Sequence, residues 1–215
     1  MAEIVPTILA SNADQYNRFV AVYKNFAKRV QIDICDGQFA PSRTVQLNQI
    51  TIPEGWQVDL HMMITKPSEH LAAILQLKPS LCIFHAECSE NLLPIFDKLQ
   101  AAGIKTGVAL LKSTYPGNVK PYIDVVDHVL IFAGKLGQQG GEADMLQTEK
   151  SPIIRELRED VEIGWDGGAN MRNIRALAHN GISVINVGSA LSHAQDAAAT
   201  YHEMVADLDK TGVVL

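Results

Sequence analysis

Polar residues that can take part in chemistry stand in or directly after several apolar, strand-like runs of this sequence. Asp33 lies in the run Gln31-Ile32-Asp33-Ile34-Cys35, where the period of two in a strand places Gln31 and Asp33 on one face. Burying a carboxylate among apolar residues is costly unless it is paired or bound to a metal. Asp33 is therefore a candidate catalytic or metal-binding residue. The alternative is that it caps or braces a neighbouring loop.

Two histidines occupy similar positions further along the chain. His61 ends the run 58–61, and His85 is followed two residues later by Glu87. His61 is either a ligand or a hydrogen-bonded core histidine. His85 and Glu87 fall on one face, and we expect them to hydrogen-bond each other in support of the site rather than to act directly.

Glycine-rich segments follow the last two strand-like runs. Asp166 precedes Gly167 and Gly168, which allow a ligand to approach the backbone closely, although a tight turn explains the same pattern. Gly188 and Ser189 follow the final run, where backbone N–H groups and a hydroxyl can hold an anion. The alternative for Ser189 is a plain helix N-cap.

Short β-rich runs alternate with longer amphipathic stretches, which is the pattern of βαβ units. The expected strands are Ile4–Leu9, Val30–Cys35, Trp56–His61, Ser80–Glu87, Lys105–Leu110, Asp127–Phe132, Val161–Trp165 and Ser183–Val187. The expected helices are Asn12–Phe26, Pro67–Leu77, Asn91–Ala102, Gly117–Ile123, Gln147–Glu159, Met171–Asn180 and Gln195–Asp209. The connection 36–53 is polar and predicts a loop. Eight units without a long linker favour a single (β/α)₈ barrel domain over residues 1–215, with a doubly wound sheet as the alternative. In a barrel all these polar residues would meet at the carboxyl ends of the strands.

Composition excludes several classes of protein. The chain has 47% hydrophobic and 20% charged residues, as ordinary soluble globular proteins do. Its net charge of −6 is spread without a basic cluster, so we expect no nucleic-acid partner. Three cysteines without a CxxC pair argue against disulfides and structural zinc. No segment resembles a signal peptide or a membrane span, and we expect a cytoplasmic protein without membrane contact.

Together these motifs resemble the ribulose-phosphate 3-epimerase family over nearly the whole chain. Six motifs of the family have counterparts here in the same order. They are Pro-Ser-Ile-Leu at Pro6–Leu9, His-x-Asp-x-Met-Asp-Gly at Gln31–Gly37, Asp-x-His-Leu/Met-Met at Asp59–Met63, His-x-Glu at His85–Glu87, Val-Asp-Gly-Gly at Trp165–Gly168 and Gly-Ser-Ala at Gly188–Ala190. The resemblance implies a (β/α)₈ barrel of the ribulose-phosphate-binding type. It also implies an isomerase of carbohydrate metabolism that epimerises the carbon beside a ketose carbonyl through an enediolate.

By this resemblance Asp33 and Asp166 are the two proton-transfer residues. A divalent cation, which can be Zn, Mn, Fe or Mg, would be held by Asp33, His61, Asp166 and Gln31, where the family has a histidine in place of Gln31. An amide oxygen is a hard, neutral donor that suits Mg²⁺ or Mn²⁺ better than Zn²⁺. We therefore expect weakened or altered metal binding.

The resemblance also implies contacts to a phosphorylated sugar, either ribulose 5-phosphate or a related ketose phosphate. The expected substrate- and phosphate-binding residues are Thr7, His61, Gly140, Gly141, Gly167, Gly168, Gly188 and Ser189. The loop 134–142 lacks the family's proline and aromatic residue, and Glu142 would bring a negative charge near the phosphate. We expect a homo-oligomer. The alternatives are a divergent barrel that has lost epimerase chemistry and binds a phosphorylated metabolite or a protein partner, and another barrel enzyme such as a metal-independent lyase.

Overall fold

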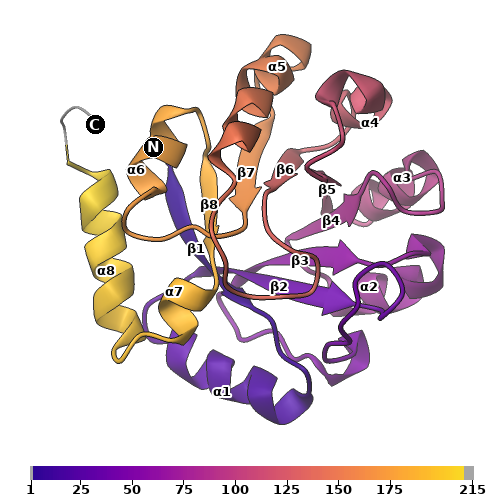
Figure 1. Ribbon diagram of the computed structural model, residues 1–215. Coiled ribbons are helices and arrows are strands. Elements are labelled where there is room, and N and C mark those ends of the chain that lie inside the picture. The colour runs from indigo at the N-terminus through magenta and orange to yellow at the C-terminus, as the bar shows by residue number, and fades with distance from the viewer. Residues whose placement is uncertain (1, 211–215) are drawn as a thin grey trace.

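A computed structural model describes residues 2–210, and it forms a closed barrel of eight parallel strands in chain order, in which β1 pairs with both β2 and β8 (Figure 1). The strands are β1 (Glu3–Ile8), β2 (Arg29–Cys35), β3 (Gln57–Met63), β4 (Leu81–His85), β5 (Lys105–Leu110), β6 (His128–Phe132), β7 (Glu162–Asp166) and β8 (Val184–Val187). Each expected strand is present, with ends shifted by at most two residues. The pairing of β1 with β8 confirms the (β/α)₈ barrel over the doubly wound sheet.

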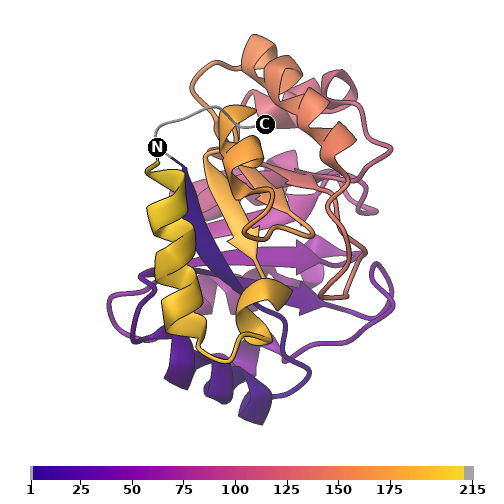
Figure 2. The ribbon, with the colours of Figure 1, turned by 60° about the vertical axis from the view of Figure 1, so that its left-hand side comes forward.

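Helices surround the barrel. They are α1 (Ala13–Tyr23), α2 (Leu71–Leu77), α3 (Leu93–Ala101), α4 (Lys120–Ile123), α5 (Lys150–Leu157), α6 (Ile174–His179), α7 (Ser189–Ser192) and α8 (Ala197–Leu208), with 3₁₀ turns η1 (Leu47–Gln49), η2 (Pro67–His70), η3 (Pro116–Val119) and η4 (Met145–Glu149). Figure 2 shows α8 alongside β1, where it contacts α1 and α6 and completes the helical layer. As expected, the connection 36–53 contains only η1, whereas α7 was not expected. No helix within residues 2–210 has the length and apolarity that a bilayer span requires.

The alternation of side chains along each strand divides the core in two. Leu81 and Ile83 of β4 point into the barrel with Ala109 and Leu130, and they form a small apolar layer at its centre. The intervening residues, such as Cys82, pack outward against the helices in the main hydrophobic core. Because the inward series continues along the strands, the polar residues that end it project into the mouth of the barrel.

The opposite, amino-terminal end of the barrel is closed by charged side chains. The Arg29 guanidinium donates to Asp59 at 2.8 Å, to Glu162 at 2.8 Å and to Glu3 at 3.2 Å. His128 Nδ1 lies 2.8 Å from the Glu162 carboxylate. These contacts join β1, β2, β3, β6 and β7, so this end of the barrel is fixed by ion pairs while the mouth carries the candidate site.

Candidate active site at the barrel mouth

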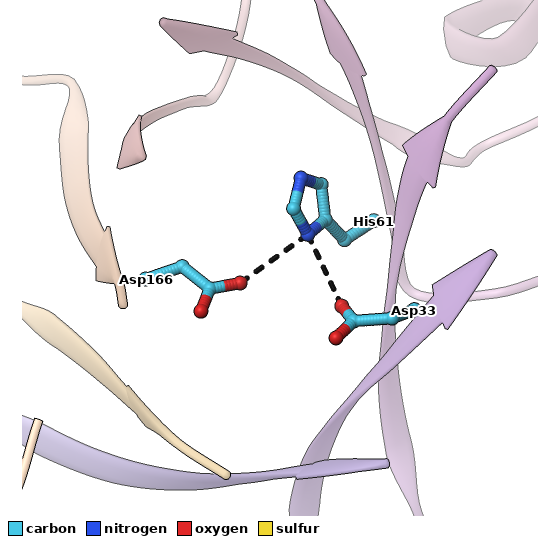
Figure 3. Close-up of side chains that lie close together, drawn as sticks. All are labelled: Asp33, His61 and Asp166. Carbon is cyan, nitrogen blue, oxygen red and sulfur yellow. Dashed lines mark hydrogen bonds and ion pairs between the residues drawn. The ribbon is translucent and has the colours of Figure 1, made fainter. Parts of the chain in front are cut away.

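Three side chains from three strands converge at the carboxyl end of the barrel (Figure 3). His61 Nδ1 lies 3.1 Å from Asp33 Oδ1 and 3.3 Å from Asp166 Oδ2. Asp33 on β2 stands directly opposite His61 on β3 in the strand register, whereas Asp166 reaches the same point from β7. The ligand atoms of the three residues lie within 4.8 Å of one another, which is the separation expected around one bound cation.

Gln31 completes the cluster from below. Its Nε2 donates to Asp33 Oδ1 at 2.9 Å and to Asp166 Oδ2 at 2.6 Å, and it lies 3.5 Å from His61 Nδ1. Two nitrogens and two carboxylate oxygens therefore alternate around a closed ring of four atoms. Gln31 Oε1, in contrast, is buried without a hydrogen-bond partner among the described residues.

Burial and mutual proximity control the charges of this cluster. Burial raises the pKa of Asp33 above its usual range, and the nearby Asp166 carboxylate adds to the rise, although hydrogen bonds from His61 and Gln31 oppose it. Burial by itself would lower the pKa of His61, but the Asp166 and Asp33 carboxylates outweigh it and raise that pKa. Two carboxylates this close favour positive charge between them, whether from an imidazolium or from a metal ion.

His85 and Glu87 extend the cluster sideways, to the carboxyl end of β4 and the turn that follows it. His85 Nε2 lies 2.9 Å from His61 Nε2, and its Nδ1 lies 3.5 Å from Glu87 Oε2. Glu87 is held by the backbone N–H of Leu111 at 3.0 Å and by the Thr114 hydroxyl. Burial lowers the pKa of His85 to about 4, so this imidazole is neutral and orients His61 instead of competing for its proton. β4 ends at His85, so Glu87 lies in the following turn and not on the expected strand.

A pocket lies above the cluster, under the connection between β6 and α5. The part of this connection before η4, residues 133–144, is the covering loop. In Figure 1 this connection passes in front of β2 and β3. Gln139 Nε2 donates to the Thr7 carbonyl at 3.4 Å, and the Ser192 hydroxyl donates to Gln139 Oε1 at 3.4 Å. The pocket retains about 30 Å³ for small molecules. That space holds about two waters, so the pocket is too small for a larger ligand with the loop in this position.

Most of the residues expected to bind substrate or phosphate line this pocket, and the two exceptions are Gly141 and His61. Thr7, Gly140, Gly167, Gly168, Gly188 and Ser189 line it, together with Asp33 and Asp166, whereas Gly141 does not. Gln31 and His61 are fully buried beneath it. Ser189 is the first residue of α7 and Gly188 is its N-cap, so the serine side chain does not serve as the cap.

Close backbone packing explains the glycine pair after β7. Gly167 has φ +125° and Gly168 has φ +69°, a region that favours glycine. A Cβ on Gly167 would collide with the Gly134 backbone, and one on Gly168 would collide with the Ala143 backbone. The two glycines therefore line the pocket and also pack directly against the backbone of the loop that covers it.

The pocket also contains residues that the sequence did not single out as site residues. Lys135 and Gln139 of the covering loop line the pocket, and so does Asn186 of β8. Asn186 is 2% exposed and its Oδ1 has no hydrogen-bond partner among the described residues. The sequence did contain a signal for Asn186, because it is a polar residue between Ile185 and Val187 in an otherwise apolar strand. Glu142, which was expected to bring a negative charge near the phosphate, is exposed and does not line the pocket. The charged residue that this loop contributes to the lining is Lys135.

The comparison with known proteins agrees with this geometry. The Ribulose-phosphate 3 epimerase family matches residues 3–192. The ribulose-phosphate 3-epimerase of Schizosaccharomyces pombe is 27% identical over 203 residues, covering 90% of this chain and 88% of that protein, and the one of Mycobacterium leprae is 28% identical over 209 residues, covering 91% and 90%. The structure of 3-hexulose-6-phosphate synthase from Salmonella typhimurium shares the fold, with a TM-score of 0.74 at 18% identity over 96% of this chain and 98% of that one. The family match spans all eight strands and every residue of the cluster, and the chain belongs to the ribulose-phosphate 3-epimerase family.

Proposed function

We propose that this chain is a 3-epimerase of a ketose phosphate, either ribulose 5-phosphate or a closely related sugar, in which Asp33 and Asp166 transfer the protons. The observation that carries the proposal is the convergence of these two carboxylates, from β2 and β7, on one imidazole beneath the pocket. The names of its relatives support the same substrate class. A single domain over residues 1–215, a homo-oligomer and a cytoplasmic location are parts of the same proposal.

Inversion at carbon needs two proton-transfer groups that approach it from different sides. One carboxylate removes the proton beside the carbonyl and the other returns a proton to the opposite face, so the configuration inverts. The raised pKa of Asp33 suits this role, because a carboxyl near neutrality can both accept and donate. Burial of His61 and Gln31 keeps water from the floor of the site.

The donor set fits a divalent cation in part. Asp33, His61 and Asp166 offer two carboxylates and an imidazole at suitable separations, which match Zn²⁺, Fe²⁺ or Mn²⁺. A cation held there would stabilise the negative charge that develops on the substrate oxygens. Gln31 directs its N–H groups, which have no lone pair, toward the position of the cation. It can therefore become a ligand only if its amide turns so that Oε1 faces the cation.

We assign the substrate phosphate to the far wall of the pocket. Gly167, Gly168, Gly188 and Ser189 offer backbone N–H groups there, and Lys135 adds a positive charge from the covering loop. Thr7 Oγ1 is buried without a partner and faces the same space, so it is available to a substrate hydroxyl. His61 lies beneath the pocket and acts through the two aspartates that its Nδ1 contacts.

The test follows the C3 proton of ribulose 5-phosphate in deuterated water, with Zn²⁺, Mn²⁺ or Mg²⁺ added in turn. The wild type should place deuterium at C3 of the product and not in the remaining substrate. Asp33→Asn and Asp166→Asn should each lower epimerisation by about 10²- to 10⁴-fold, and each should retain exchange from one epimer only.

Asp160→Asn, whose side chain is 80% exposed, is the control for a surface carboxylate and should have no effect. If the wild type exchanges the proton at the background rate with every cation, the barrel has lost epimerase chemistry and the proposal is wrong. If either single variant retains full turnover, the two-aspartate assignment is wrong.

A further inference from the structure

Gln31 is the polar group of the site whose placement conflicts with a role as a cation ligand. A ligand must offer a lone pair, but the amide nitrogen has none and carries two hydrogens. It is this nitrogen that lies between Asp33 Oδ1 and Asp166 Oδ2, whereas the amide oxygen, which could coordinate a cation, is buried away from them without a partner.

The opposite orientation of the amide is unfavourable in the absence of a cation. It would place Oε1 about where Nε2 lies now, 2.6 Å from a carboxylate oxygen of Asp166 and 2.9 Å from one of Asp33. Two carboxylate oxygens and the amide oxygen, which has a partial negative charge, would then face one another in a buried site. The amide nitrogen would also move to the position of Oε1, where the structure provides no partner.

We propose that the Gln31 amide is a clamp that takes the place of the cation in the metal-free protein. Its two N–H groups, together with the Nδ1 side of His61, hold Asp33 and Asp166 in their mutual positions. A cation that enters must displace the amide nitrogen from between the two carboxylates, so bound metal and clamped amide exclude each other. The inference deepens the proposed function, since it concerns the same cation position, but its test requires no substrate.

Burial makes this exclusion strict. Gln31 and His61 are fully buried and Asp33 is 6% exposed, so the amide cannot swing out to solvent when a cation arrives. Gln31 is flanked in the sheet by Thr7 of β1 and Asp59 of β3. Hydrogen bonds to ionised carboxylates are among the stronger ones in proteins, and a cation must replace two of them. The expected result is a site that stays organised without metal and binds metal weakly.

The test compares Gln31→Met with the wild type, both stripped of metal. Methionine keeps the length of the side chain but cannot donate, and its thioether is a poor ligand for the hard cation Mn²⁺. The matched control is Gln147→Met, because Gln147 also donates to a carboxylate, Asp144 at 3.3 Å, and also has an unpartnered Oε1. The measurements are the thermal midpoint in a chelator and the Mn²⁺ dissociation constant by calorimetry.

A clamp predicts that Gln31→Met lowers the midpoint in chelator by about 5 °C, more than Gln147→Met does, because the two carboxylates lose their shared donor. It also predicts that Gln31→Met binds Mn²⁺ about tenfold more tightly, which corresponds to about 1.4 kcal/mol, since no amide competes. An ordinary ligand predicts the opposite sign, namely weaker binding. Unchanged or weaker binding overturns the inference, and so does a midpoint equal to that of the control.

If Gln31→Met does not fold, the wild type provides a second measurement. In nitrogen-15 NMR spectra the side-chain amide of Gln31, assigned by its absence from Gln31→His, should show protected, downfield protons in chelator. Saturating Mg²⁺ should remove that protection. Protection that persists with Mg²⁺ bound, or that is absent in chelator, contradicts the clamp. Failure of the epimerase assay alone leaves both measurements unaffected, so the two proposals fail separately.

Discussion

The Ser42 hydroxyl donates a hydrogen bond to the carbonyl oxygen of Gly137 at 2.7 Å and so ties the loop after β2 to the loop after β6, across 95 positions of sequence. Gly137 has φ +66°, and a Cβ at this position would collide with the Ser42 side chain. Only glycine therefore allows the two loops to approach this closely. The contact holds the covering loop in place together with the contacts of Gln139 to Thr7 and Ser192.

Ser42→Ala should favour the open loop. Loss of one hydrogen bond of about 1 kcal/mol should raise the KM for ribulose 5-phosphate about fivefold, with little change in thermal stability. Limited proteolysis should cleave residues 134–142 faster. The control is Ser89→Ala, which removes a comparable bond to the Thr65 carbonyl at 2.8 Å. Equal KM values for the two variants would show that the tie does not control access.

Asn186→Leu should separate binding from stability. Asn186 Oδ1 is buried without a partner, so an apolar residue of similar size should leave the protein as stable or more stable. If a substrate hydroxyl donates to this oxygen, the KM should rise about tenfold, since a hydrogen bond to substrate is lost. Steady-state kinetics and thermal unfolding measure the two effects. An unchanged KM would leave Asn186 without a role in substrate binding.

Trp165→Phe should destabilise the turn formed by Gly167 and Gly168 after β7. Trp165 is fully buried and its indole N–H donates to the Gly167 carbonyl at 2.9 Å. The substitution removes this bond and part of the packing, and should destabilise the protein by about 2–3 kcal/mol in denaturant unfolding. It should also weaken inhibition by inorganic phosphate. Trp56→Phe, at a half-buried tryptophan distant from this turn in the strand order, is the control. Unchanged inhibition would remove the turn from the phosphate site.

Glu162 predicts a pH-dependent contribution to stability. Burial would raise its pKa, but hydrogen bonds from His128 and Arg29 outweigh burial and lower the pKa below its usual 4.5. A carboxylate with a depressed folded pKa stabilises the fold above its unfolded pKa and loses that effect as pH falls through the folded pKa. Glu162→Gln should therefore be less stable than the wild type at pH 7, and the difference should shrink below about pH 4.5. Exposed Glu159→Gln is the control, and a difference that stays constant with pH would contradict the prediction.

Much of the fold was predictable because its signals are local. Strands are marked by short apolar runs and helices by their amphipathic period, so the order of eight strands follows directly from the sequence. The exceptions are short: α7 spans only Ser189–Ser192, and the 3₁₀ turns begin several connections where a continuous helix was expected. Segments of one turn have too little periodicity to be read, and their conformation depends on packing against neighbours.

The sequence by itself predicted the four side chains of the polar cluster, Gln31, Asp33, His61 and Asp166. The period of two puts Gln31 and Asp33 on the inward face, and the strand ends place His61 and Asp166 at the same mouth. It could not determine which atoms face each other. The contact between Gln31 Nε2 and Asp166 Oδ2 joins residues 135 positions apart, and the direction of the amide follows from the charges around it. The pairing of His61 with His85, the closure of the loop at Ser42 and the unpartnered Asn186 were likewise decided by the tertiary structure. The physical reason is that strand period and residue type are properties of a few neighbouring residues, whereas hydrogen-bond partners, burial and charge depend on groups that only closure of the barrel brings together.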